Sequence, residues 1–376
     1  MVDVREAAVR VLRDRRFVDE AIEKPREALD PRDRALLTQL VFGATRHRLT
    51  LDWLVDRNAK FCDDMLRPIF RVALYQVLFL DRIPAYAAVD AAVEHVKREM
   101  PGKVKFANAL LRSCLRDTAK GLDPILPDDR VQRLAIQYSH PPWLVARWLK
   151  RFGKKTESIL RADNLVMPVT AHRLGQATPI DIEGDVTQRK DWKELIVQDA
   201  TAMAVAPFLG AKPGEHIADL CASPGGKACH LADMVGKKGI VVAMDVGKMA
   251  PMRDNLQRLG LTSARLVIGD GVRPPLRAGF DAVLVDAPCS NTGVLARRPD
   301  ARWRIAPEDP EKMAMLQRRL LDVALTLVKK GGRVVYSTCS LESEENEGVV
   351  AGRAEKEMLT LPSTAAAGGY MARIRP

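Results

Sequence analysis

Two short segments place a cysteine where a nucleophilic thiol would be useful. The first is DAPCS (residues 286–290) and the second is CS (residues 339–340). Each follows a short apolar run, FDAVLVD or GRVVYST, which predicts a strand that ends at the cysteine loop. Loops at strand ends commonly display functional side chains, and a thiolate is an effective nucleophile. For Cys289 and Cys339 the sequence therefore favours a chemical role over the commoner role of a small buried hydrophobe.

The remaining thiols are expected to be packing residues. No C-x-x-C pair occurs, so neither a zinc site nor a disulfide framework is indicated, and we expect no metal. These four cysteines are Cys62, Cys114, Cys221 and Cys229.

A glycine-containing loop, CASPGGK (residues 221–227), follows the apolar run HIADLC and opens a helix. Adjacent glycines let a backbone turn tightly and approach a ligand, whereas the common phosphate-loop and dinucleotide-loop spacings do not fit here. Asp245 and Asp270 end the next two expected strands. Taken singly, each aspartate is more often a turn or cap residue. Three loops at one edge of a sheet instead favour a cofactor that carries a nucleoside.

The elements that must position these loops fall into two kinds of pattern. Apolar residues recur at helical spacing over residues 4–116, where prolines divide the stretch into five or six expected helices. The segment GLDPILPDD resembles a linker, residues 131–164 are again helical, and a less patterned stretch runs to residue 197. From residue 215 short apolar strands alternate with helices such as 312–329, which predicts a mostly parallel sheet with helices on both faces.

Motifs along nearly the whole chain resemble the bacterial 16S ribosomal RNA cytosine-5 methyltransferase family. DLCASPGGK, DAPCSNTG and YSTCSLESEENE resemble its cofactor, Pro-Cys and Thr-Cys motifs, and FANALLRSCLR belongs to a front part similar to NusB. The resemblance implies a multidomain fold. An all-α NusB-like RNA-binding domain would occupy residues 1–118, and a linker with a helical connector would occupy residues 119–197. Residues 198–376 would form an α/β Rossmann-like methyltransferase domain that depends on S-adenosylmethionine (SAM).

The resemblance also implies roles for individual residues. Cys339 would attack the cytosine ring, Cys289 would assist release of the product, and Asp286, if protonated, would hydrogen-bond ring nitrogen 3. Carbon 5 of cytosine is a poor nucleophile until a thiolate adds to carbon 6. The residues expected to bind SAM are Cys221, Ala222, Ser223, Pro224, Gly225, Gly226, Lys227, Asp245, Asp270 and Asp286.

Lys227 and Trp303 each keep two interpretations. Lys227 would support Asp286 or orient the base, or be a solvated residue at a helix start. Arg297 and Arg298 would contact RNA phosphate, and Trp303 would stack on a base or anchor a core. The segment VGKMAPMRDN after Asp245 is shorter than the family pattern and contains a proline.

Bulk composition agrees with an RNA partner. The net charge is +11, most of it in the first 165 residues, which favours an anionic partner. No apolar run approaches membrane-spanning length and the N-terminus does not resemble a secretory signal, so we expect a cytoplasmic protein that does not enter membranes. We also expect a monomer.

Two alternatives remain at this point. A DNA cytosine-5 methyltransferase would use the Pro-Cys thiol as nucleophile and would not need Cys339. A non-catalytic RNA-binding protein would retain the fold without the chemistry, but intact motifs at every strand end disfavour it.

Overall fold

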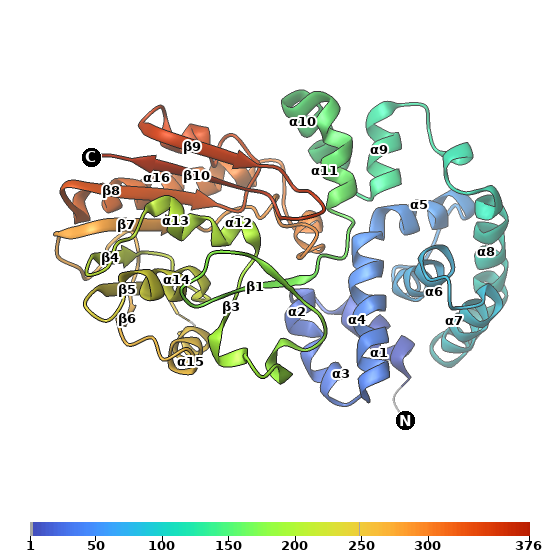
Figure 1. The fold of residues 1–376 in the computed structure, drawn as a ribbon. Coiled ribbons are helices and arrows are strands. Elements are labelled where there is room, and N and C mark those ends of the chain that lie inside the picture. Colours follow the sequence, from blue (N-terminus) through green and yellow to red (C-terminus); the bar gives the residue numbers. More distant parts are fainter. Residues whose placement is uncertain (1–2, 248) are drawn as a thin grey trace. The chain divides into compact units, whose positions relative to one another are not determined.

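The computed structural model describes residues 3–247 and 249–376 (Figure 1). The chain divides into two compact units. The first runs to Asn164 and includes Arg302–Arg304, and the second comprises Leu165–Ala301 and Ile305–Pro376. The expected division into residues 1–118, 119–197 and 198–376 stays a prediction.

The first unit is built from α-helices, and the apolar faces of those within residues 4–117 meet in one core. Leu40, Leu54 and Phe70 are fully buried there. Asp30 caps the helix that begins at Pro31 by accepting hydrogen bonds from two backbone N–H groups. The α-helices are α1 Val4–Arg13, α2 Val18–Ala21, α3 Glu23–Glu27, α4 Pro31–Arg46, α5 Arg48–Asn58, α6 Arg67–Phe79, α7 Ala85–Glu99, α8 Val104–Asp117, α9 Arg130–Tyr138, α10 Pro142–Phe152 and α11 Thr156–Ala162. Short 3₁₀ turns are η1 Pro101–Lys103, η2 Thr118–Lys120, η3 Asp123–Ile125 and η4 Gly153–Lys155.

The expected number of helices in residues 4–116 was too low. The described part of this stretch holds eight α-helices, α1 to α8. Two of them, α2 and α3, have only four and five residues, which is too short for a helical period to appear in the sequence.

The tripeptide Arg302–Arg304 packs inside the first unit. Arg302 is fully buried, and its guanidinium donates to the carbonyl oxygens of Ser139 at 2.9 Å and Asp163 at 3.0 Å. The indole of Trp303 donates to the Thr45 carbonyl at 2.7 Å. Of the two interpretations of Trp303, the structure therefore supports the anchor.

The second unit is organised around a seven-stranded sheet with the order β6-β5-β4-β7-β8-β10-β9. Neighbours from β6 to β8 are parallel, and β10 pairs antiparallel with both β8 and β9. The expected mostly parallel sheet is confirmed. Its strands are β4 His216–Asp219, β5 Ile240–Asp245, β6 Ala264–Ile268, β7 Phe280–Asp286, β8 Val328–Thr338, β9 Ala354–Thr360 and β10 Gly369–Ile374.

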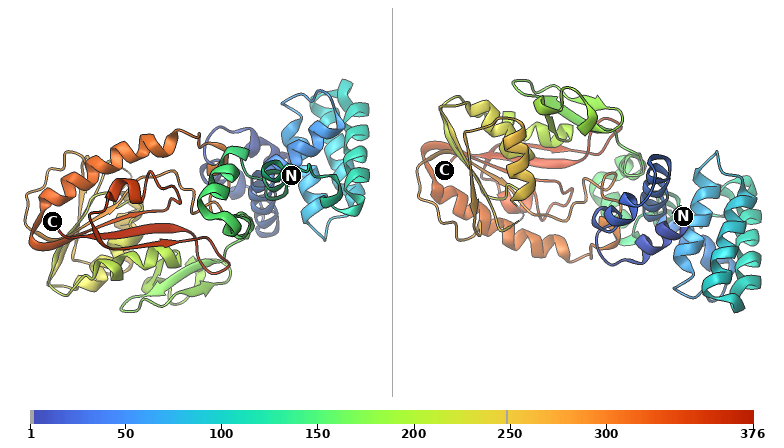
Figure 2. Two further views of the ribbon diagram at one scale, coloured as in Figure 1. Left: turned by 90° about the horizontal axis from the view of Figure 1, so that it is seen from above. Right: turned by 90° about the horizontal axis from the view of Figure 1, so that it is seen from below.

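Helices cover both faces of this sheet, as Figure 2 shows. Leu320 and Leu321 of α16 pack with Val283 on one face. Leu231 of α14 and Met252 of α15 pack with Val241 on the other. The helices of this unit are α12 Ala200–Met203, α13 Val205–Leu209, α14 Gly226–Val235, α15 Ala250–Arg258, α16 Asp309–Leu327 and α17 Glu347–Val350, with the 3₁₀ turns η5 Val186–Gln188, η6 Trp192–Glu194 and η7 Ala301–Trp303.

The stretch that lacked a pattern in the sequence forms a second sheet. β1 (Val169–Arg173) lies between β2 (Ile180–Ile182) and β3 (Leu195–Val197), and both pairs are antiparallel. Two of the strands have three residues, so alternation is too brief to be recognised.

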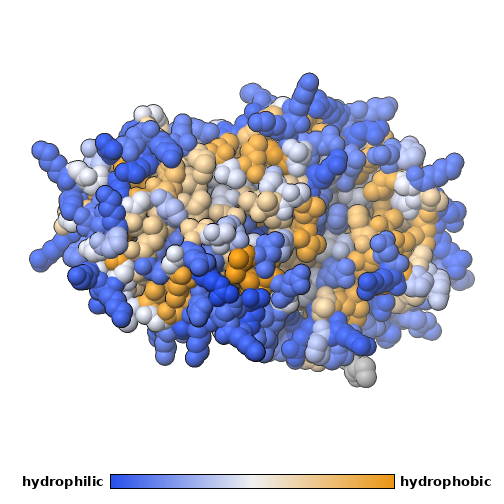
Figure 3. All heavy atoms as spheres, in the orientation of Figure 1, coloured by the Kyte–Doolittle hydropathy of each residue, from blue (hydrophilic) through white to orange (hydrophobic). Residues whose placement is uncertain are grey.

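The surface gives no sign of a membrane-spanning segment. Every helix within residues 3–247 and 249–376 is too short or too polar to cross a bilayer. On the face drawn in Figure 3, hydrophilic side chains are interspersed among smaller hydrophobic patches.

Candidate active site

The loops that follow β4, β5, β7 and β8 emerge at one edge of the large sheet because these strands are parallel. The loop after β4 is the one rich in glycine. Gly225 has φ +110°, and a Cβ at this position would lie 2.6 Å from Cγ of Met252. Only glycine fits the turn that brings the start of α14 to the sheet edge.

A cavity of about 230 Å³ opens beside this loop. Arg258 and Asn255 of α15 line one side, and residues of β3 line another. Of the residues predicted to bind the cofactor, those lining the cavity are Cys221, Ala222, Ser223, Pro224, Gly226, Lys227 and Asp286.

Gly225, Asp245 and Asp270 are not among the lining residues. Asp245 instead accepts a hydrogen bond from the Ser223 N–H at 2.9 Å, so it braces the glycine-containing loop. Asp270 is exposed and accepts from the Val272 N–H at 2.9 Å, which is the turn geometry that the sequence allowed as the simpler interpretation.

The proline after Asp245 does not interrupt a helix. α15 begins at Ala250, so Pro251 lies in its first turn. Backbone N–H groups in the first turn have no partner within the helix, so a proline there costs no helical hydrogen bond.

Two buried polar atoms beside this cavity lack a partner among the described residues. They are Oδ2 of Asp219, the last residue of β4, and Oε1 of Gln198. Burial raises the pKa of Asp219 to about 7, and the nearby Asp286 carboxylate acts in the same direction. Unsatisfied acceptors in a cavity indicate a ligand that carries hydrogen-bond donors. Sequence analysis missed Asp219, although a carboxylate in the apolar run HIADLC was a usable signal.

Lys227 and Asp286 form an ion pair at the end of the cavity. The Lys227 Nζ lies 2.6 Å from Oδ2 of Asp286, and Ser337 donates to Oδ1 at 2.8 Å. Burial alone would lower the pKa of Lys227, but attraction to Asp286 outweighs it and raises that pKa. With a side chain only 18% exposed, Lys227 is not the solvated residue of the second interpretation.

The thiols of Cys289 and Cys339 lie side by side, with 3.1 Å between their Sγ atoms. The hydrogen bond between them, together with burial, raises the pKa of Cys289 well above its ordinary value. Cys339 also donates to Oδ1 of Asn291 at 3.2 Å, and the Asn291 amide donates to the Cys289 carbonyl at 2.9 Å. Asn291 has φ +62°, a conformation that asparagine tolerates better than most residues. The sequence analysis gave Asn291 no role.

A second, smaller cavity adjoins the thiols. Cys339 lines it and Cys289 does not. Lys227 and Asp286 line both cavities, so the ion pair stands where the two meet. The ion pair thus separates a larger cavity beside the glycine-containing loop from a smaller one that Cys339 lines.

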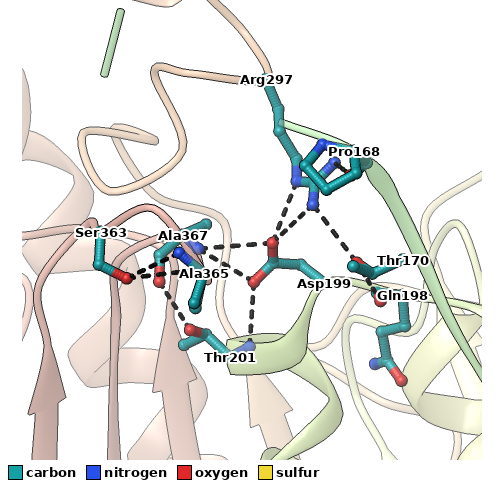
Figure 4. A network of polar contacts seen from close by, with 10 residues as sticks. Pro168, Thr170, Gln198, Asp199, Thr201, Arg297, Ser363, Ala365 and Ala367 are labelled. Atoms are coloured by element: carbon teal, nitrogen blue, oxygen red, sulfur yellow. Dashed lines mark hydrogen bonds and ion pairs between the residues drawn. The ribbon is translucent and has the colours of Figure 1, made fainter. Parts of the chain in front are cut away.

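Asp199 ties together three segments at the rim of the second cavity (Figure 4). It caps α12 by accepting from the Thr201 N–H at 3.0 Å, and it accepts from the Ala367 N–H at 3.3 Å. Arg297 donates to it at 2.9 Å and also to the Pro168 carbonyl at 3.0 Å. The guanidinium of Arg297 is thus engaged within the fold, and of the two arginines predicted to contact phosphate, only Arg298 is exposed.

The burial of Cys62 and Cys114 agrees with their predicted packing role, whereas Cys221 and Cys229 line the larger cavity. Cys62, Cys114 and Cys229 are buried and Cys221 is partly buried. Burial raises the pKa of Cys114 and of Cys229 to about 12 and also raises the pKa of Cys62 and Cys221. Within the described ranges, no group of three or more His, Cys, Asp or Glu side chains is arranged to hold a metal ion.

Comparisons with known proteins agree with this architecture. Residues 206–368 match the family model described as 16S rRNA methyltransferase RsmB/F, and residues 2–116 match the NusB family. A probable ribosomal RNA small subunit methyltransferase B of Synechocystis is 35% identical over 93% of this chain and 88% of its own. The probable ribosomal RNA small subunit methyltransferase B of Bacillus subtilis is 34% identical over 86% of this chain and 80% of its own. The ribosomal RNA small subunit methyltransferase B of Escherichia coli O1:K1 is 33% identical over 85% of this chain and 81% of its own.

Solved structures show the same fold. The crystal structure of PH0851 has a TM-score of 0.79 at 23% identity and covers 100% of this chain and 99% of its own. A methyltransferase homolog from Pyrococcus horikoshii has a TM-score of 0.56 at 23% identity, over 66% of this chain and 99% of its own.

Proposed function

The chain belongs to the RsmB/F family of 16S rRNA methyltransferases, and from this membership we propose that it methylates carbon 5 of a cytosine in small-subunit ribosomal RNA through a covalent adduct to Cys339. The family uses SAM, and the substrate is RNA. The choice of small-subunit RNA follows the names of the relatives.

The cavity beside the glycine-containing loop suits SAM. Its free acceptors, Oδ2 of Asp219 and Oε1 of Gln198, match the ammonium group and hydroxyls that SAM carries. The 221–227 loop would hold the methionine part, Asp245 the ribose, and Asp270 the adenine side. When bound, SAM supplies an electrophilic methyl group.

One observation carries the proposal: two thiols 3.1 Å apart, of which only Cys339 lines the cavity next to the Lys227–Asp286 pair. Attack by the Cys339 thiolate forms a bond from sulfur to carbon 6 and makes carbon 5 nucleophilic. Carbon 5 then takes the methyl group. Loss of the carbon 5 proton restores the ring double bond and breaks the bond from sulfur to carbon 6.

The raised pKa of Cys289 favours its protonated form, so this second thiol would donate a hydrogen bond to the Cys339 sulfur as it leaves as a thiolate. Solvent water would take the carbon 5 proton. Both oxygens of Asp286 accept hydrogen bonds, from Lys227 and Ser337. If protonated when the base is bound, Asp286 would donate to ring nitrogen 3 as charge develops there.

The test is transfer of tritium from labelled SAM to small-subunit ribosomal RNA, followed by mapping of bisulfite-resistant cytosines. We expect tritium at one cytosine of this RNA. The same cytosine should resist bisulfite in RNA from the wild-type strain and lose that resistance in a deletion strain. Label on DNA alone would favour the DNA enzyme, and SAM binding without transfer to any RNA would favour the non-catalytic alternative. Label on another base atom would refute carbon 5 as the target.

A further inference from the structure

A buried carboxyl group lies between the two cysteine loops and takes no part in the chemistry above. Glu345 belongs to the loop between β8 and α17 and is fully buried. Its Oε1 accepts from the Ser290 N–H at 2.9 Å and from Nε2 of Gln317 at 3.1 Å. Its Oε2 accepts from the hydroxyls of Ser290 and Ser340. Four donors thus use the acceptor sites of one carboxylate.

The donors come from both thiol-bearing loops. Ser290 directly follows Cys289 and Ser340 directly follows Cys339, and the two hydroxyl oxygens lie 3.1 Å apart. Gln317 of α16 also donates to the Pro288 carbonyl at 2.8 Å, on the other side of Cys289. The carboxylate of Glu345 therefore holds the residue next to each thiol, and Gln317 of α16 holds the carboxylate.

The loop that carries Glu345 is itself anchored to β8. The hydroxyl of Tyr336 donates to the Glu345 carbonyl at 2.6 Å. Asn346 accepts from the Thr338 hydroxyl at 2.6 Å and donates to the Ser340 carbonyl at 2.9 Å. These bonds fix the backbone at Glu345, so its carboxylate has a fixed position and fixes the Cys289 loop through Ser290.

We propose that Glu345 is a positioning residue that sets the separation of the Cys289 and Cys339 thiols. Its carboxylate is hydrogen-bonded to Ser290 and Ser340, the residues next to the two thiols, and acts on the thiol positions through them. Its charge also raises the pKa of Cys289. Burial raises the pKa of Glu345, and the four hydrogen bonds offset this only in part. The inference rests on the proposed function of the two thiols.

The kinetic test compares Glu345→Ala with Glu345→Gln and with Glu347→Ala, an exposed neighbour in α17. Misplacing reacting groups by about 1 Å costs about 100-fold in rate, so we expect Glu345→Ala to lower kcat by about that factor. KM for SAM and for RNA should stay within about twofold, because the cavities keep their lining. Glu345→Gln retains the Oε1 acceptor and should recover part of kcat, whereas Glu347→Ala should match the wild type.

A second readout needs neither RNA nor SAM. Diamide oxidises two adjacent thiols to a disulfide and takes up their two hydrogens, and the rate depends on the separation of the Sγ atoms. Mass spectrometry of the linked peptides measures this rate for Cys289 and Cys339. We expect Glu345→Ala to slow it at least tenfold, since the loops lose their shared acceptor, and Glu347→Ala to leave it unchanged.

Wild-type turnover and wild-type cross-linking in a folded Glu345→Ala protein would overturn the inference. If that variant does not fold, the same two measurements are made on Ser340→Ala, which removes one donor to the Glu345 carboxylate. Wild-type values in both measurements would again overturn the inference. Absence of methyl transfer by the wild-type protein would refute the proposed function instead, while the cross-linking rates would still decide the role of Glu345.

Discussion

The Sγ atom of Cys289 lies 3.1 Å from the Sγ atom of Cys339, although the two residues are 50 positions apart in the chain. They follow adjacent parallel strands, β7 and β8, whose register pairs Asp286 with Ser337. The sheet thus places two thiols at one point, as the proposed mechanism requires.

The two thiols should behave differently when each is removed. Cys339→Ala should abolish methylation and form no RNA adduct, because the ring is never activated. Cys289→Ala should lose turnover and accumulate protein joined to methylated RNA, in a form that survives denaturing gel electrophoresis and requires SAM. Cys62→Ala, at a buried thiol of the first unit, serves as the control. Adducts in Cys339→Ala but none in Cys289→Ala would show that the Pro-Cys thiol attacks.

Asp245→Ala should weaken SAM binding about tenfold, since it removes the acceptor of the Ser223 N–H, and a hydrogen bond to a charged group is worth about 1.5–3 kcal/mol. Isothermal titration calorimetry measures this affinity. Asp254→Ala, at an exposed position of α15, should bind SAM as the wild type does. Equal affinity of Asp245→Ala and the wild type would rule out this role.

Asp199→Ala should lower kcat/KM for RNA while leaving SAM affinity unchanged. The variant loses the link between α12, Arg297 and Ala367 at the rim of the cavity that Cys339 lines. Steady-state methylation at varied RNA concentration provides the measurement, and Asp181→Ala, exposed on β2, is the matched control. Normal kcat/KM would mean that the rim keeps its shape without this carboxylate.

Residues 1–118 should fold alone and bind RNA with steep salt dependence. The buried core of this region draws on residues between Val4 and Cys114, and its basic charge implies release of counterions on binding. Circular dichroism of the fragment and its RNA affinity at several salt concentrations provide the test. An affinity that does not change between low and moderate salt would contradict the electrostatic account.

Acid should destabilise the first unit through His47. Burial lowers the pKa of this imidazole from 6.5 to about 3, and the ring stacks on Phe79 with 3.9 Å between centroids. The neutral imidazole is therefore favoured in the folded state. The contribution of His47 to the free energy of unfolding is present above pH 6.5 and is lost as the pH falls toward 3.

In His47→Phe the melting temperature should fall less between pH 7 and pH 5 than in the wild type. One kcal/mol corresponds to about 2–4 °C in a domain of this size, so calorimetry can detect the difference. His216→Gln, at an exposed histidine, is the control. Equal acid sensitivity of His47→Phe and wild type would assign the effect to other groups.

Local sequence was sufficient for the strand ends of the large sheet and for the loops that follow them. Short apolar runs marked β4, β5, β6, β7 and β8, and the motifs after them indicated Cys289 and Cys339 as candidate functional thiols. Such patterns are readable because each strand and its loop are contiguous in the chain, and burial of a strand imposes apolar residues on every position.

Other features depend on contacts between distant residues, which a local pattern does not encode. The role of Glu345 required two loops about 50 residues apart to meet at one carboxyl group. The engagement of Arg297 required Asp199, 98 positions earlier, and the unpaired Oδ2 of Asp219 emerged only from its burial beside a cavity. A side chain's partners are set by how the strands pair and the helices pack, so only the tertiary structure decided which polar residues of this chain act together.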